Sequence, residues 1–103
     1  MDTTTGTITL AERDGHQCVV LVGEVDLGAV RRFQSEHRDT GHVDAIVAED
    51  LTFIDSSGLK FLLQVQAANP GVCLPRPPKP LRDLLELTGT AERFGLGGPD
   101  LSS

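Results

Sequence analysis

The sequence contains neither tryptophan nor tyrosine, and only four of its 103 residues are phenylalanine. Single-stranded nucleic acids bind on platforms of stacked aromatic side chains, so this scarcity disfavours such a function. Basic residues are also few: nine Lys and Arg stand against fifteen Asp and Glu, and the formal net charge is −6. This balance disfavours nucleic acid and anionic membrane as partners. It is compatible with a basic protein surface as partner, and equally with simple solubility.

The chain also lacks a long apolar run and a targeting segment. Residues 1–5 show no basic region followed by apolar residues, and no stretch reaches membrane-spanning length. We therefore expect a cytoplasmic protein without membrane insertion. A length of 103 residues with 39% hydrophobic and 23% charged residues predicts one globular domain. Its core covers about residues 7–94, and residues 95–103 form a loose tail rich in glycine.

Cofactor and metal motifs are missing as well. The two cysteines, Cys18 and Cys73, lie in apolar runs and form no metal or redox motif, so we expect small buried side chains. No histidine or carboxylate pair has convincing ligand spacing, and no glycine-rich loop precedes a helix to bind phosphate. The sequence predicts neither a metal nor a cofactor.

Hydrophobic patterning predicts alternating strands and helices. Strands are expected at residues 7–10, 18–22, 43–48 and 72–74, and the Asp14-Gly15 pair predicts a hairpin between the first two. A first helix should begin after Asp26, with Leu27, Val30, Phe33 and His37 on one face, and end at Gly41. A second should follow Asp55, and a third should place Leu81, Leu84, Leu85 and Leu87 before Gly89. This order predicts an α/β fold with a partly parallel sheet covered by helices.

Residues 55–59, with the sequence Asp-Ser-Ser-Gly-Leu, form the turn between a strand and the second helix. Asp and Ser are preferred helix caps because their oxygens accept free N–H groups of the first turn. A hydroxyl at such a position is also a candidate for phosphorylation. Phosphoserine adds a charge of about −1.5 to −2, which a helix N-terminus tolerates and Asp55 would repel. The turn therefore predicts a surface whose charge changes while the fold stays intact.

Two catalytic alternatives use the same turn. A serine hydrolase needs a base beside Ser56 or Ser57, but no nucleophile elbow surrounds them and the histidines lie elsewhere in the sequence. A phosphoryl-accepting Asp55 would need a pair of acids after the first strand and a late lysine, and neither is evident. The residues thus favour a binding module that is not an enzyme.

Three segments together resemble one family. Residues 51–59 resemble the signature of the STAS-domain anti-sigma factor antagonists, residues 23–26 (Gly-Glu-Val-Asp) resemble a second segment of that family, and residues 84–89 resemble its late helix and glycine. The resemblance covers about residues 7–94. It implies the STAS fold, a small mixed sheet of four to five strands with helices packed mainly on one side.

The resemblance also implies a mechanism in bacterial transcription. The unphosphorylated antagonist binds an anti-sigma factor that is a serine kinase, and the sigma factor is released. Phosphorylation of the first serine of the motif ends this binding, and a serine phosphatase reverses it. Carried onto this chain, Ser56 is the phosphorylated residue and Ser57 the alternative. The partner-binding residues are Asp26, Asp55, Ser56, Ser57, Gly58 and Leu59.

The chain departs from the family at several points, including the proline-rich run at residues 75–80, the absence of sequence for a further C-terminal helix, and two single positions. Val47 stands where members often have Asp or Asn, and Lys60 where Gly is common. These departures leave open a member with another partner or one that is no longer phosphorylated. The alternative function is a non-switching STAS interaction domain in a signalling or lipid-transport complex, and a small hydrolase is the third.

Overall fold

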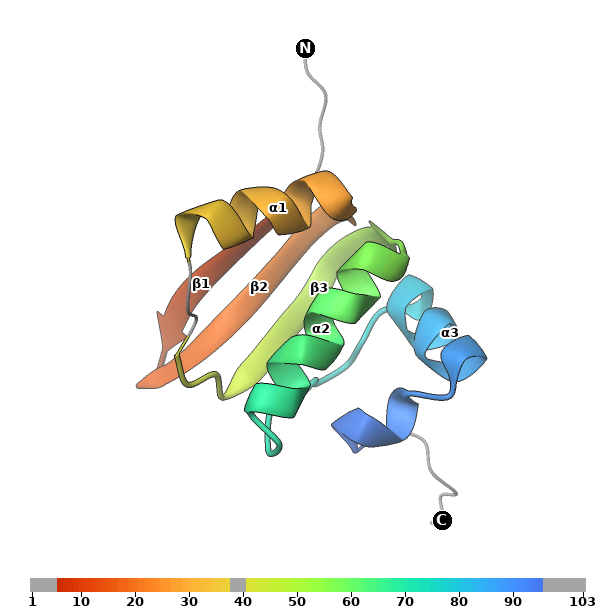
Figure 1. The fold of residues 1–103 in the computed structure, drawn as a ribbon. Coiled ribbons are helices and arrows are strands. Elements are labelled where there is room, and N and C mark those ends of the chain that lie inside the picture. Colours follow the sequence, from red (N-terminus) through yellow and green to blue (C-terminus); the bar gives the residue numbers. More distant parts are fainter. Residues whose placement is uncertain (1–5, 38–40, 96–103) are drawn as a thin grey trace.

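The structure is a computed structural model that describes residues 6–37 and 41–95 (Figure 1). The elements run β1 (Thr7–Arg13), β2 (His16–Val25), α1 (Leu27–Glu36), β3 (Ala45–Ile54), α2 (Ser56–Ala68), α3 (Lys79–Thr88) and the 3-10 helix η1 (Ala91–Phe94). The strands form one sheet in the order β1-β2-β3, with β1 antiparallel and β3 parallel to β2. The predicted α/β class and the mixed sheet are confirmed.

The sheet has fewer strands than predicted. Three strands are present in the described ranges, and residues 72–74 contribute only an isolated bridge between Cys73 and Ala45. Cys73 accepts a bond from the Ile46 N–H (2.8 Å) and donates one to the Asp44 carbonyl (3.0 Å). The ladder stops there because prolines, which have no N–H to donate, follow at once. Cys73 is exposed, so the expectation of a buried cysteine is correct only for Cys18.

The first hairpin forms as the sequence predicts. Asp14 and Gly15 make a two-residue turn, and Arg13 pairs with His16. Both turn residues have positive φ, 53° and 80°. The turns that suit the twist of paired strands require this conformation, and an Asp-Gly pair adopts it at low cost.

β3 is longer than predicted because its pattern is not a simple alternation. Its buried residues are Ile46, Ala48, Leu51 and Ile54, so the spacing changes from two to three. Two register shifts against β2 explain this spacing, because each leaves an extra residue on β3. Residues 49–54 therefore belong to the strand, although the predicted strand ends at residue 48.

The helices cover one face of the sheet. α1 and α2 lie side by side over this face, and α3 lies beside α2 near β3 (Figure 1). Phe33 of α1 meets Phe61 of α2 edge to face, with 5.3 Å between ring centroids. The most deeply buried large side chains include Phe33, Leu21, Ile46, Leu62, Leu81 and Leu85. None of the helices in the described ranges is both long and apolar enough to cross a bilayer.

The first helix ends earlier than predicted. Its last residue is Glu36, and the N–H of His37 closes it by donating to the Phe33 carbonyl at 2.8 Å. The imidazole of His37 stacks on the Phe33 ring, with centroids 4.6 Å apart. Gly41 thus lies beyond the helix. The predicted tail lies outside the described residues, apart from Gly95.

Candidate functional site

The strand-end site comprises Asp26, Asp55, Ser56, Ser57, Gly58 and Leu59, and its two aspartates are equivalent helix caps. Asp26 precedes α1 and accepts the Ala29 N–H at 3.0 Å. Asp55 precedes α2 and accepts the Gly58 N–H, also at 3.0 Å. Both predicted caps are confirmed. In each carboxylate the cap uses one oxygen, and the second has no hydrogen bond to the described residues.

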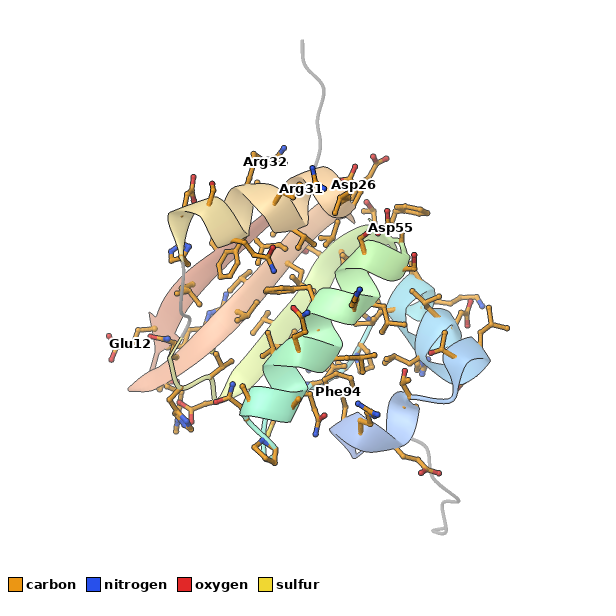
Figure 2. All side chains as sticks on the ribbon, in the orientation of Figure 1. Glu12, Asp26, Arg31, Arg32, Asp55 and Phe94 are labelled. Carbon is orange, nitrogen blue, oxygen red and sulfur yellow. The ribbon has the colours of Figure 1, made fainter. Side chains whose placement is uncertain are left out.

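Parallel pairing brings the two caps to the same end of the sheet. Val25 pairs with Ile54 in register, and the Asp55 N–H donates to the Val25 carbonyl at 3.3 Å. The residues that follow this pair, Asp26 and Asp55, therefore emerge side by side. Figure 2 shows both at the end where α1 and α2 begin. Two carboxylates and two helix N-termini are thus concentrated in one region.

The structure distinguishes the two serines. Ser56 is the first residue of α2 and is exposed. Ser57 is partly buried and lines a hollow of about 250 Å³ between α1 and α2, together with Leu27, Val30 and Phe61. Ser56 is therefore accessible from solvent without movement of a helix, and Ser57 contributes instead to the wall of the hollow.

Gly58 and Leu59 lie beneath the surface of the site. Gly58 is buried, and a Cβ added there would lie 2.6 Å from Ile54 Cγ1 and 3.0 Å from Val25 Cγ1. The missing side chain allows α2 to start close against the strand ends. Leu59 is only 5% exposed and packs in the core. The structure places both residues in support of the turn, while Asp26, Asp55 and Ser56 reach its surface.

Leu27 is a surface residue of this region that the sequence pattern assigned to the buried helix face. It is the first residue of α1 and remains 45% exposed. Its position in the sequence, one residue after the Asp26 cap, could have identified Leu27 as a surface residue, because the first turn of α1 lies at the end of the sheet. Leu27 also lines the hollow between α1 and α2 together with Ser57.

The titratable groups at the other end of β2 and β3 form a separate cluster. The Asp44 carboxylate accepts the Gln17 N–H (3.0 Å) and contacts His42 Nε2 (2.6 Å) and His16 Nδ1 (3.5 Å). The hydrogen bond from Gln17, and then that from His42, hold the pKa of Asp44 below its ordinary value.

None of the chain's three histidines, all of which are described, is hydrogen-bonded to Ser56. Among the described residues no group of three or more ligands could hold a metal ion.

No family model matches the chain, and no curated protein matches it. The resemblance of residues 51–59 to the STAS signature and the geometry of the strand-end site are therefore the grounds for a function.

Proposed function

We propose that this chain is a phosphorylation-switched protein-binding module of the anti-sigma factor antagonist type. Unmodified, it binds an anti-sigma factor that is a serine kinase, and phosphate on Ser56 ends the binding. The observation that supports this proposal is the exposed Ser56 hydroxyl at a turn where two capping carboxylates, Asp26 and Asp55, emerge from adjacent strands. Assignment of this three-stranded α/β fold to the STAS family belongs to the same proposal.

Electrostatics explains how such a switch would operate. The N-terminus of α2 carries about half a positive charge, so the fold accommodates a phosphate on Ser56. A partner that covers the same surface must desolvate this phosphate beside the carboxylates of Asp26 and Asp55. Like charges in a desolvated contact repel strongly, and the partner is released. The exposed Leu27 and the hollow between α1 and α2 supply apolar contact in the unmodified state.

The direct test is phosphate mapping. The purified chain is incubated with ATP and its cognate anti-sigma kinase, and the product is digested and analysed by mass spectrometry. We expect one phosphate, on Ser56, and none in Ser56→Ala. Ser57→Ala is the matched control and should still be labelled. Labelling of Ser57 alone, or of neither serine with an active kinase, would contradict the proposal.

A non-switching interaction domain is the second candidate. The exposed Leu27 and the adjoining hollow favour it, because neither needs a phosphate in order to contact a partner. A pull-down from native extract separates the two functions. A sigma-regulating kinase among the bound proteins supports the switch, and transporter subunits bound to an unphosphorylated chain support the alternative.

A further inference from the structure

The sheet has a second face, opposite the helices, that no described helix or strand covers (Figure 1). This open face consists of side chains that alternate with the buried ones along each strand. Its members are Thr7, Thr9 and Arg13 of β1, Val20, Val22 and Glu24 of β2, and Val47, Asp50 and Phe53 of β3. The face is apolar along its middle and charged at its ends.

Its two ends differ in shape. At the carboxyl end of the parallel strands Phe53 projects, with 50% of its surface exposed, and Val22 beside it is 40% exposed. At the amino end the surface is hollowed by about 470 Å³. The hollow is lined by Arg13, His16, Cys18, Asp44, Ala45, Gly71 and Cys73. One end thus has a projecting phenyl ring and the other a hollow larger than such a ring.

The charges on the face are also divided between its ends. Glu24 and Asp50 lie at the carboxyl end and Arg13 at the amino end, and none of the three forms an ion pair with the described residues. His16, beside Arg13, is held by Asp44. A surface with an acid end and a basic end is complementary to its own antiparallel copy.

We infer that the open face binds a second copy of this chain about a twofold axis that crosses the strands near Val20. This rotation lays β3 over the partner's β3 with the directions reversed, so Phe53 of each copy enters the hollow of the other. It also lays Glu24 over the partner's Arg13 and His16. Both contacts occur twice, as an isologous interface requires. Two antiparallel-facing sheets pack in this way about 10 Å apart.

The size of the face sets the strength of this dimer. Three strands are about 14 Å wide and eight residues about 26 Å long, which gives roughly 360 Å² of flat area per copy. A stable complex buries about 800 Å² of accessible surface per partner. The flat area of the open face is smaller than this value. The dimer is therefore weak, reversible and dependent on concentration, and it leaves the strand-end site accessible on the helix side.

The test is sedimentation equilibrium of the full chain over a wide concentration range. We expect a monomer–dimer equilibrium that Phe53→Ser weakens at least tenfold. Leu87→Ser is the matched control, because Leu87 is 83% exposed on α3, away from the face. Glu24→Arg and Arg13→Glu should each weaken the dimer. The double variant should recover it, because the ion pair is rebuilt with reversed sign.

A chemical probe gives a reading that does not depend on variants. Cys73 lines the hollow, so its alkylation by iodoacetamide should slow as protein concentration rises and the partner's Phe53 covers it. A wild-type chain that is monomeric at every concentration overturns the inference. A dimer whose dissociation constant is unchanged in Phe53→Ser also overturns it. So does a double variant of Glu24 and Arg13 that associates no more strongly than either single variant. The inference does not depend on phosphorylation of Ser56.

Discussion

The side chains of Ser56 and Asp55 are adjacent in sequence, but the fold depends on them differently. Asp55 holds the first turn of α2 by accepting the Gly58 N–H at 3.0 Å. The Ser56 hydroxyl makes no hydrogen bond to the described residues and is exposed. Charge can therefore be added at Ser56 without loss of a contact, whereas a change at Asp55 removes a cap. This difference is what permits a residue to act as a switch within a stable element.

A Ser56→Asp variant tests the repulsion at this position. An added carboxylate beside Asp26 and Asp55 should weaken binding of the anti-sigma kinase at least tenfold, about 1.4 kcal/mol, while the thermal midpoint stays near that of wild type. Isothermal calorimetry measures the affinity.

Ser35→Asp is the control for this variant, because it adds the same charge to an exposed serine in the last turn of α1. Affinity that is equal in wild type and Ser56→Asp would exclude repulsion at Ser56 as the mechanism.

The element that carries the switch, α2, is positioned by both of its ends. At its start, Gly58 allows close contact with Ile54 and Val25. At its other end Asn69, only 7% exposed, accepts the Val43 N–H with its Oδ1 and donates from Nδ2 to the Val65 carbonyl, both at 3.0 Å. The hydrogen bond from the Val43 N–H ties the end of α2 to the chain that leads into β3. The helix is thus fixed between the end of one strand and the approach to the same strand.

Gly58→Ala should displace the start of α2. The new Cβ would lie 2.6 Å from Ile54 Cγ1, closer than real Cβ contacts, so the core must shift. Overpacking of this kind costs about 1–3 kcal/mol, which urea unfolding would detect.

Gly28→Ala is the matched control, near the start of α1. Its added Cβ would meet Asp26 Oδ1 at 3.4 Å, an ordinary contact, so the variant should be as stable as wild type or more stable. Equal loss of stability in both variants would show that helix starts in general, and not the contact with Ile54, are sensitive.

Local signals explain which elements could be predicted from the sequence. The Asp14-Gly15 hairpin, the caps at Asp26 and Asp55, and the end of α3 at Gly89 each depend on a few neighbouring residues. The extent of β3 and the exposure of Cys73 depend on pairing with distant segments. A one-dimensional pattern does not contain that pairing. Only the family resemblance predicted that Asp26 and Asp55 belong to one site. Their spacing in the sequence does not predict it, because the parallel register of β2 and β3 brings the two residues together.

At the scale of the whole molecule, the two ends of the sheet differ in chemistry. The strand-end site gathers capping carboxylates and exposed serine, while the opposite end gathers Asp44, His16 and His42. Asp44 joins the starts of the two parallel strands, because its backbone N–H also donates to the Gln17 carbonyl at 2.8 Å. Lowering the pH should therefore reduce the stability of the protein through the end of the sheet that contains Asp44, which is remote from Ser56.

The stability contributed by Asp44 should depend on pH. Because its folded pKa is lowered, the contribution is present above the unfolded pKa of about 3.9 and is lost as pH falls through the folded value. The free energy of unfolding of wild type should exceed that of Asp44→Asn at neutral pH, and the difference should shrink below about pH 4.

Asp83→Asn controls for the change in net charge, since Asp83 pairs with Lys79 on exposed α3. Urea titrations across this range give the values. A difference between wild type and Asp44→Asn that stays constant with pH would show that the Asp44 carboxylate is not held in its charged form by the fold.

The two register shifts in β3 give that strand spare chain length. β2 takes seven steps from Cys18 to Val25, while β3 takes nine from Ala45 to Ile54. An in-frame deletion of Thr52, which has no partner on β2, can be absorbed by straightening the strand, whereas the deletion of one residue in β2 turns every later side chain to the wrong face. A change of one residue in the length of β3 therefore leaves Asp55 and Ser56 beside Asp26, and neither helix has to be rebuilt.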